Sequence, residues 1–401
     1  MKVCFLTANF PPEALGGTEQ VVVALARELR AAGVDVAVLS GSDMTHAGDD
    51  ELTEVYDGTP VWRLPRRGDE YDQHGFVRPR LLALLRARLL RLRPDVVHVH
   101  SFSVLGCGLA ALCAELGVPM VVTCHDLWVT CARHFRLPGA GVSCPTGVDR
   151  TPCVACVNEL LHAPPSVVAA VLAERDRLVR GEFAAAAAVT APSVTAARFV
   201  RECVPYPGAI EVIPHGLLRP VPSGERAAAP RPDERLRVGT FGGLVRAKGL
   251  VELLDAVAGL PCELHLAGRL HEPELRAVVA QYERGGLPVV WHGPFGPGDR
   301  HPARDLHLAV FPSKCQETYG LVVDEALAHG VPTVVSDAGA LRERAGAPGV
   351  VVVPLARLAE VLRELVGSPP RLAALRAAIP VDLPGIAASA RRHLELYRRL
   401  R

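Results

Sequence analysis

The sequence predicts an α/β protein made of two doubly wound domains, each a parallel sheet with helices on both faces. Two observations lead to this fold class. Short apolar runs alternate with helical patterns along nearly the whole chain, and the alternation lapses once, at a proline-rich segment near the middle, before it resumes. The length of 401 residues exceeds one ordinary domain and suits two, each with its own core.

The first domain is expected over residues 1–213. It opens with a strand-like run, Val3–Ala8, and an amphipathic helix, Gln20–Ala32, that ends at Gly33. Right-handed crossovers place the loops that follow parallel strands on one edge of the sheet. The further strands expected in this domain, separated by helical segments, are Val34–Leu39, Val96–His100, Met120–Thr123 and Ala188–Thr190.

A linker is expected at residues 214–235, because Pro214–Glu234 contains five prolines and two glycines. The second domain is expected over residues 236–380, where the alternation resumes. Residues 381–401 are left for a C-terminal helix, whose pattern covers Ile386–Arg401. The strands expected in the second domain are Leu236–Phe241, Leu264–Ala267, Val289–Trp291, Leu308–Phe311, Thr333–Val335 and Val350–Val353.

The overall composition argues against several classes of protein. A net charge of +1 and a pI near 7.7 argue against a dedicated nucleic-acid binder. No stretch reaches the roughly 18 apolar residues that a membrane span needs. The N-terminal apolar run ends at Asn9, which is too short for a signal peptide. We therefore expect a cytoplasmic protein whose 11 cysteines are thiols or metal ligands rather than disulfides.

The most informative segment runs from Val310 to Asp337 and reads as strand, loop, helix, strand. Its helix pattern opens near Gly320 and stops at Gly330. In such a parallel unit the loop faces the N-terminus of the helix, where an anionic ligand binds. Two carboxylates bracket this turn, Glu317 in the loop and Glu325 about one and a half turns into the helix.

This segment closely resembles the nucleotide-sugar site of family-4 retaining glycosyltransferases. The resemblance rests on the spacing Glu-x7-Glu after Pro-Ser and on the ending Glu-Ala-Leu-Ala-x-Gly-x-Pro. It implies the GT-B architecture, in which two Rossmann-like domains face each other across a cleft and the last helix crosses back to the first domain. It also implies an activity: transfer of a sugar, with retention, from a nucleotide-diphosphate donor to an alcohol acceptor, either a glycan or a secondary metabolite.

By this resemblance, the second domain holds most of the donor. Glu325 would accept the ribose hydroxyls, while Glu317 and the amides after it would hold the hydroxyls of the sugar. The other donor-binding residues that this loop implies are Thr318, Tyr319, Gly320 and Leu321.

The first loop of the second domain, Gly239–Gly249, follows a strand and precedes a helix. Glycines at such a turn let the backbone approach a diphosphate, and a lysine adds positive charge. In the family this loop reads Gly-Arg-Leu-x-x-x-Lys-Gly, and its arginine and lysine clamp the diphosphate. Lys248 matches the lysine, but after Gly242 the arginine position is Gly243. Either Arg246 reaches the same phosphate or backbone amides hold it alone.

The first domain offers two further candidates. The turn Gly16-Gly17-Thr18-Glu19 resembles the family's turn against the donor phosphate and the acceptor, although a Gly-Gly before a helix is as often mere turn chemistry. It is not Gly-x-Gly-x-x-Gly, which argues against a dehydrogenase. In similar enzymes a histidine at the position of His125 hydrogen-bonds the donor sugar and adds charge near the departing phosphate. The alternative is that His125 and Asp126 form a local cap.

The resemblance implies catalysis without a strong protein base or a catalytic metal. The leaving diphosphate takes the acceptor proton on the face of the cleaved bond, and His125, Glu317 and Lys248 are the catalytic candidates. Two rival functions stay open. A nucleotide-sugar epimerase or hydrolase on the same fold would consume the donor without an acceptor. A donor-binding protein that has lost turnover would be consistent with the missing arginine at Gly243.

Two features are not explained by this site. The segment 131–156 carries Cys131, Cys144, Cys153 and Cys156, whose Cys-x2-Cys pair predicts a four-thiolate structural zinc site, with free thiols as the alternative. The segment Val77–Arg93 is basic and rich in leucine. It predicts either a weak peripheral contact with an anionic membrane or a helix that packs its leucines on the first sheet.

Overall fold

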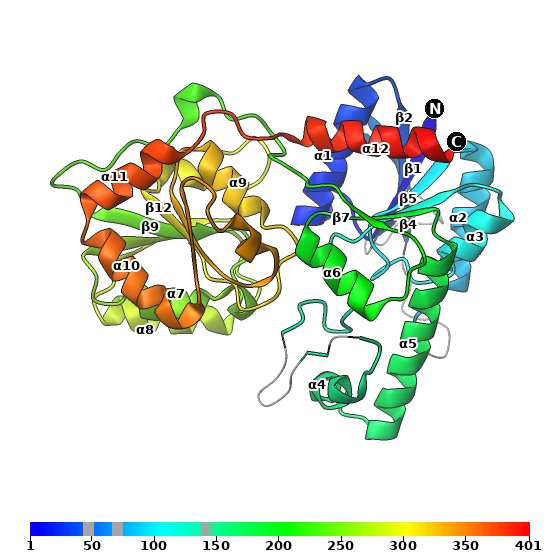
Figure 1. Ribbon diagram of the computed structural model, residues 1–401, viewed down its shortest axis with the longest axis horizontal. Coiled ribbons are helices and arrows are strands. Elements are labelled where there is room, and N and C mark those ends of the chain that lie inside the picture. Colours follow the sequence, from blue (N-terminus) through cyan, green and yellow to red (C-terminus); the bar gives the residue numbers. More distant parts are fainter. Residues whose placement is uncertain (43–51, 66–74, 138–143, 146) are drawn as a thin grey trace. The chain divides into compact units, whose positions relative to one another are not determined.

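The computed structural model describes residues 1–42, 52–65, 75–137, 144–145 and 147–401. The chain divides into two compact units (Figure 1). Unit 1 comprises Met1–Leu218 and Ile386–Arg401, and unit 2 comprises Arg219–Gly385. Each unit is a parallel sheet covered by helices, so the predicted fold class, two Rossmann-like α/β domains, is confirmed.

The described residues of unit 1 form a sheet of eight strands in the order β3-β4-β2-β1-β5-β6-β7-β8. All neighbours pair in parallel except β3 and β4, which are antiparallel. The order reverses direction between β1 and β5, so the loops after these two strands meet at a topological switch point. The strands are β1 (Lys2–Thr7), β2 (Asp35–Ser42), β3 (Leu52–Tyr56), β4 (Thr59–Pro65), β5 (Val96–Val99), β6 (Met120–Thr123), β7 (Ala188–Ala191) and β8 (Ile210–Val212).

Alternation along β1 shows why this sheet has helices on both faces. Cys4 and Leu6 belong to the core under α2, α3, α5 and α6, whereas Val3 and Phe5 belong to the core under α1 and α12. Successive side chains of a strand point to opposite faces, so a run that is apolar throughout is buried on both. The helices of unit 1 are α1 (Gly17–Ala31), α2 (Pro79–Leu92), α3 (Leu109–Glu115), α4 (Thr151–Leu161), α5 (Pro165–Ala185), α6 (Val194–Cys203) and α12 (Ile386–Leu400).

Helix α2 is the basic, leucine-rich segment. Its side chains Leu81, Leu85 and Leu89 recur every four residues and are buried in the core of unit 1. Arg86 pairs with Glu115 at 2.5 Å, on the solvent side. The leucines therefore pack on the sheet, as the second of the two interpretations predicts. No single described helix is both long and apolar enough to cross a membrane; α4 and α5 pass that test only together, as a pair bent by 110°.

The described residues of unit 2 form a parallel sheet of six strands in the order β11-β10-β9-β12-β13-β14. Here the switch point lies between β9 and β12, which are hydrogen-bonded neighbours. The strands are β9 (Leu236–Phe241), β10 (Cys262–Ala267), β11 (Val289–Gly293), β12 (Leu308–Phe311), β13 (Thr333–Ser336) and β14 (Val350–Val353). The α-helices are α7 (Leu250–Val257), α8 (Glu274–Arg284), α9 (Leu321–Ala328), α10 (Leu358–Val366) and α11 (Pro369–Ala378).

Short 3-10 helices shape the loops of unit 2. They are η1 (Ser223–Glu225), η2 (Arg246–Lys248), η3 (Pro302–Asp305), η4 (Gly339–Arg344) and η5 (Leu355–Arg357). The proline-rich segment is held against unit 2: Ala227 N–H donates to the carbonyl of His329 at 2.8 Å, and Arg376 donates to the carbonyl of Ala227. The last helix joins unit 1, where Ile386 N–H donates to the carbonyl of Leu217 at 2.9 Å.

Candidate functional site

The switch point of unit 2 brings two loops together. One follows β9 over residues 242–249, and the other follows β12 over residues 312–320. Gly249 has φ +80°, and a Cβ atom built there would lie 1.9 Å from the carbonyl oxygen of Pro312. Only glycine permits this approach, because any side chain would collide with that backbone. The glycine at the end of the predicted phosphate loop therefore sets how close the two loops come.

Lys248 and Glu317 meet across these loops. Lys248 Nζ donates to Glu317 Oε1 at 2.5 Å, and Ser313 Oγ donates to the same oxygen at 2.5 Å. Partial burial acts to lower the pKa of Lys248, but the carboxylate of Glu317 and the thiol of Cys315 outweigh it, so the pKa is raised. The lysine therefore keeps its positive charge at neutral pH. These two predicted catalytic residues lie together, and Ser313, the serine of the Pro-Ser pair that precedes the Glu-x7-Glu spacing, joins them.

Helix η4 fixes the backbone of Glu317. Ala340 N–H donates to the Glu317 carbonyl at 2.8 Å, and Gly339 N–H donates to the side chain of Gln316 at 2.8 Å. Gly339 has φ +59°, and a Cβ atom there would lie 2.3 Å from both Glu317 N and O. The backbone at Gln316 and Glu317 is thus held against the start of η4.

Tyr319 is held by two charged residues. Its hydroxyl donates to Asp324 Oδ2 at 2.7 Å, and Arg344 pairs with Asp324 at 2.8 Å while lying 4.9 Å from the centre of the Tyr319 ring. Thr318 is half-buried beside it, and Gly320, with φ +87°, precedes the first turn of α9 at Leu321. Asp324 stands next to Glu325 in the sequence and could have been noticed there. The role of Arg344 has no local sequence signal.

The loop after β9 is open at Gly243, the position of the missing arginine. A Cβ atom at Gly243 would meet nothing within 4 Å, so an arginine has room there. Arg246 is 48% exposed, and its guanidinium Nε lies 3.5 Å from Glu272 Oε2. Its backbone N–H donates to the same carboxylate at 3.0 Å. Gly242, with φ +107°, donates its N–H to the carbonyl of Ala267 at 3.0 Å, which fixes the start of the loop.

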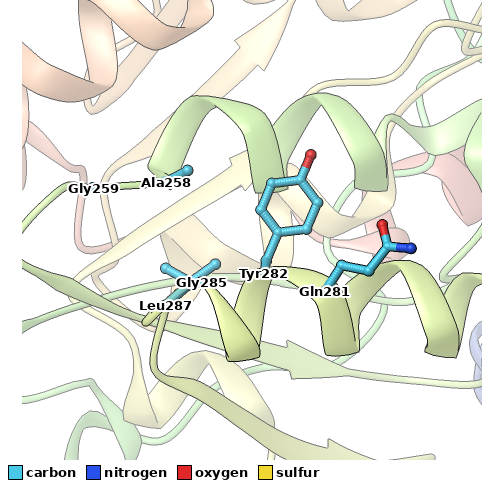
Figure 2. Close-up of a pocket in the computed structure, with 6 residues that line it drawn as sticks. All are labelled: Ala258, Gly259, Gln281, Tyr282, Gly285 and Leu287. Atoms are coloured by element: carbon cyan, nitrogen blue, oxygen red, sulfur yellow. The ribbon is translucent and has the colours of Figure 1, made fainter.

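Glu325 lies on α9, beside His301, whose Nε2 is 3.7 Å from Glu325 Oε2. His301 also lies next to a pocket of about 340 Å³ at the carboxyl ends of β10 and β11. The pocket is lined by Ala267, His292, Pro294, Phe295, Asp299, Arg300, Pro302 and Asp305. A second pocket, shown in Figure 2, is lined by residues that precede β10 and β11, among them Gly259 and Leu287. It therefore lies at the opposite, amino-terminal edge of the sheet.

In unit 1 the Gly16-Gly17 turn begins α1 directly after the loop that follows β1. The carboxylate of Glu19 folds back on this turn, since a Cβ atom at Gly16 would lie 2.5 Å from Glu19 Oε2. Burial raises the pKa of Glu19, and the neighbouring carboxylate of Asp126 raises it further. The predicted turn and the His125-Asp126 pair are therefore neighbours at this sheet edge.

His125 lies in a chain of buried imidazoles. Its Nε2 is 2.8 Å from His100 Nδ1, and its Nδ1 is 3.4 Å from His215 Nε2. The ring of His100 lies 4.0 Å from that of His98, whose Nδ1 is 2.6 Å from the hydroxyl of Tyr397 on α12. Both ring nitrogens of His125 thus face other histidines, and the array links three strand ends to the last helix.

Burial, reinforced by the neighbouring histidines, lowers the pKa of His98, His100 and His125 well below the usual value. Burial likewise lowers the pKa of His215 to about 3 and that of His393 on α12 to about 4. These side chains are neutral at pH 7. The expectation that His125 adds positive charge near the phosphate is therefore wrong, because desolvation in the core disfavours the charged imidazole.

The four cysteines of the predicted zinc site come from three places. Cys131 lies in the loop after Trp128, Cys144 lies further along, and Cys153 and Cys156 lie one turn apart on α4. The expected Cys-x2-Cys knuckle is therefore a helix, opened by Pro152 in its first turn. All 11 cysteines are free thiols. Among the residues that the structure describes, no group of three His, Cys, Asp or Glu side chains is arranged to hold a metal ion.

Two family models divide the chain much as the two units do. One, described as Glycosyltransferase Family 4, matches residues 15–217, and the other, described as Glycosyl transferases group 1, matches residues 235–368. Together they cover both switch points, with the Gly16-Gly17 turn and His125 in the first match and the Lys248 and Glu317 loops in the second.

Curated relatives and solved structures agree with these models. The chain is 31% identical to D-inositol 3-phosphate glycosyltransferase 1 of Catenulispora acidiphila, over 90% of this chain and 85% of the relative. It is 28% identical to an MMP alpha-(1->4)-mannosyltransferase of Mycolicibacterium hassiacum, over 89% and 87% of the two chains. HepE of Anabaena in complex with UDP matches 100% of both chains with a TM-score of 0.67 at 17% identity, which shows a shared fold. The chain therefore belongs to Glycosyltransferase Family 4 and is a retaining glycosyltransferase of GT-B fold that uses a nucleotide-sugar donor.

Proposed function

We propose that this enzyme binds a nucleoside-diphosphate sugar at the switch point of unit 2 and transfers the sugar to a hydroxyl of a polyol acceptor of the cyclitol-phosphate or sugar class. The contact between Lys248 and Glu317 at 2.5 Å carries the donor half of the proposal, because it puts a cation and a carboxylate where the two loops meet. The acceptor class follows the relative named D-inositol 3-phosphate glycosyltransferase 1, at 31% identity.

The diphosphate would bind between the loop after β9 and the N-terminus of α9. Lys248 supplies the positive charge, and the backbone N–H groups around Gly242, Gly243 and Gly320 supply uncharged donors. A diphosphate carries more negative charge than a single carboxylate, so it competes for Lys248 with Glu317. Binding of the donor would thereby release Glu317 to accept hydrogen bonds from the hydroxyls of the sugar.

The nucleoside would lie along α9 toward the pocket of about 340 Å³. Glu325 would accept the ribose hydroxyls through its two carboxylate oxygens. Thr318 and Tyr319 would line the sugar and the phosphates, with the Tyr319 ring kept in place by Asp324 and Arg344. Leu321 would contribute its backbone N–H at the start of α9.

Chemistry at this site would need no strong protein base. The bond from the anomeric carbon to the diphosphate breaks, and the acceptor hydroxyl passes its proton to the leaving diphosphate on the same face of the sugar. Lys248 and the amides stabilise the negative charge that grows on the leaving diphosphate. One hydrogen-bond donor in such a role contributes about 10²–10³ in rate. In unit 1 we propose that the bare backbone of Gly16 and Gly17 and the neutral His125 hydrogen-bond a sugar or an alcohol without adding charge, His125 by exchanging one of its two histidine partners for the ligand.

The proposal is tested by following donor and acceptor separately. Thermal stabilisation by UDP, GDP, ADP and dTDP identifies the base, because a ligand of the folded state raises its stability by mass action. The matching nucleotide sugar is then incubated with and without D-inositol 3-phosphate. Transfer that requires the acceptor supports the proposal. Consumption of the donor alone would indicate a hydrolase or epimerase, and tight nucleotide binding without turnover with any tested acceptor would indicate a binding protein.

We also propose that Cys131, Cys144, Cys153 and Cys156 hold a structural zinc ion once their thiols turn toward one another. Burial raises the pKa of Cys144 to about 11, and the other three thiols are near enough to contribute to the shift. The core around α4 is small, with Val157, Val168 and Leu172 at its centre. A metal would supply the stability that this core lacks.

Elemental analysis of the purified enzyme tests this site. About one equivalent of zinc, lost from a Cys153→Ser/Cys156→Ser double variant, would support it. A metal-free protein in which all four thiols react freely in the native state would overturn it. Binding of the nucleoside diphosphate should be unaffected in both cases, since Lys248, Glu317 and Glu325 belong to unit 2.

A further inference from the structure

Glu325 has a histidine beside its carboxylate. His301 Nε2 lies 3.7 Å from Glu325 Oε2, a distance too long for a hydrogen bond but short enough for a small movement to make one. His301 immediately precedes η3, and η3 leads into β12. The histidine is therefore anchored to the strand whose loop carries Glu317.

The ring of His301 has a defined proton. Ala303 N–H donates to His301 Nδ1 at 3.2 Å, so Nδ1 presents a lone pair and the proton of the neutral ring is on Nε2. That Nε2 atom is buried and has no hydrogen-bond partner. A buried N–H group without an acceptor is unfavourable. The oxygen that can relieve it is the carboxylate of Glu325.

Three aromatic rings hold the imidazole of His301 in this orientation. Phe241 and Phe295 meet it edge-on, with ring centres 4.9 and 5.3 Å away. His329 stacks on it at 4.5 Å with an interplanar angle of 18°. His329 is itself fixed, because its Nδ1–H donates to the carbonyl of Glu225 at 2.8 Å. The Nε2–H of His301 is therefore aimed by packing and does not depend on a flexible side chain.

We infer that His301 is a positioning residue that orients Glu325 for the two ribose hydroxyls and so gives the site its preference for a ribonucleotide over a 2′-deoxyribonucleotide donor. The inference rests on the proposed function, which assigns the ribose to Glu325. When the ribose binds, His301 Nε2–H closes onto Glu325 Oε2. Each carboxylate oxygen keeps lone pairs for a hydroxyl, and the carboxylate loses its freedom to rotate away from the diol.

The test compares dissociation constants for UDP and 2′-deoxyUDP, or for GDP and 2′-deoxyGDP if guanine is the base that binds. Four variants are needed. His301→Phe keeps an aromatic ring against Phe241 and His329 but removes the N–H, whereas His301→Gln keeps an N–H donor. Glu325→Ala removes the carboxylate, and His271→Ala, at an exposed loop position of unit 2, serves as the control.

A site that hydrogen-bonds a ligand hydroxyl rejects the analogue that lacks it, so the wild type should prefer the ribonucleotide by about tenfold or more. His301→Phe should cut this ratio at least about threefold, while His301→Gln and His271→Ala stay within about twofold of the wild type. Glu325→Ala should bring the ratio close to one. A mere packing defect would weaken both nucleotides equally and leave the ratio unchanged.

The outcomes separate the inference from the function on which it rests. If Glu325→Ala abolishes the preference while His301→Phe and His301→Gln both keep it, His301 does not position Glu325 and the inference is overturned. If Glu325→Ala itself keeps the preference, the assignment of ribose to Glu325 fails. Should His301→Phe not fold, His301→Gln compared with His301→Leu gives the same contrast between a side chain with an N–H donor and one without.

Discussion

The switch points of the two units have the same topology, but one is lined by charged side chains and the other by neutral ones. In unit 2 the edge carries ion pairs: Lys248 with Glu317, Arg344 with Asp324, and Arg246 with Glu272. In unit 1 the corresponding edge is built from the buried, neutral imidazoles of His100, His125 and His215, joined nitrogen to nitrogen. The difference shows that a parallel sheet places its loops at one edge without determining their chemistry.

The contrast matches the two halves of the proposed reaction. A diphosphate is anionic and changes its charge distribution as the bond to the sugar breaks, so a cation near it contributes to catalysis. The transferred sugar and the acceptor hydroxyl that attacks it are neutral, and they need directed hydrogen bonds rather than charge. A neutral imidazole array also leaves unit 1 sensitive to acid, because a proton taken up by any member would put a positive charge in the core, away from water.

Acidification should give the largest difference between the units. An unfolded histidine titrates near 6.5, whereas the folded-state pKa of His215 is about 3 and that of His393 about 4. Below pH 6.5 the unfolded chain binds more protons than the folded one, so stability falls as the pH falls. At pH 5 each of these two buried, neutral histidines lowers the free energy of unfolding by about 2 kcal/mol relative to neutral pH. Unit 1 also contains His98, His100 and His125, whose pKa values are lowered for the same reason. In unit 2 burial lowers the pKa of fewer described histidines, namely His265, His329 and His307, the last to about 4.

The alkylation of two buried thiols can measure the unfolding of each unit separately. Cys4 in β1 and Cys262 in β10 are both fully buried. After urea unfolding at pH 7.5 and at pH 5, a brief alkylation pulse at pH 8 labels each thiol in proportion to the unfolding of its unit. The urea midpoint for Cys4 should fall further than that for Cys262. His393→Asn should recover part of the loss, whereas equal shifts at both thiols would break the electrostatic contrast between the units.

Lys248→Ala should lower kcat/KM by about 10²–10³, since it removes the cation at the leaving group. The chain provides a matched control in Lys314, which is similarly exposed, lies in the neighbouring loop, and pairs with Glu252 at 2.7 Å. Lys314→Ala should leave kcat/KM within about twofold of the wild type. Steady-state kinetics with the preferred donor measures both. A loss below tenfold in Lys248→Ala, or equal losses in the two variants, would show that unit 2 does not act through this charge.

The smallest effects are expected at the loop after β9. If Arg246 substitutes for the arginine absent at Gly243, Arg246→Ala should lower turnover by about two- to fivefold, as for an exposed charge. Gly243→Arg should raise turnover by a similar factor, because the position is open. Unchanged kinetics in Arg246→Ala would show that Arg246 does not replace the arginine absent at Gly243. The backbone amides alone would then hold that part of the diphosphate.

The strands of both sheets could be predicted because buried parallel strands are apolar throughout, and the predicted strands lie within two residues of those observed, apart from the longer end of β2. Sequence reasoning missed β3 and β4, although Asp57-Gly58 between them is a strong hairpin signal. It also missed the short edge strand β8. Helix α4 was missed because the Gly- and Pro-rich stretch before it favoured a loop throughout.

The residues of the candidate site also fall into those that could be predicted from the sequence and those that could not. Lys248, Glu317 and Glu325 could be named because each stands at a fixed spacing within one strand-loop-helix unit. The groups that hold these side chains come from other parts of the chain and leave no local pattern, as with His301 beside Glu325 and Ala340 at the carbonyl of Glu317. Sequence alone also suggested a charged His125, because the burial that keeps it neutral is a property of the folded core.

The central claim, that unit 2 holds the donor nucleotide through Glu325 and the two loops beside it, is tested most directly by titration calorimetry. The nucleoside diphosphate that binds the wild type best is titrated into Glu325→Ala and into Glu360→Ala. Glu360 lies on α10 and forms an exposed pair with Arg357. Glu325→Ala should weaken binding by about 1–3 kcal/mol, and Glu360→Ala should bind like the wild type. Unchanged affinity in a folded Glu325→Ala protein would contradict the account.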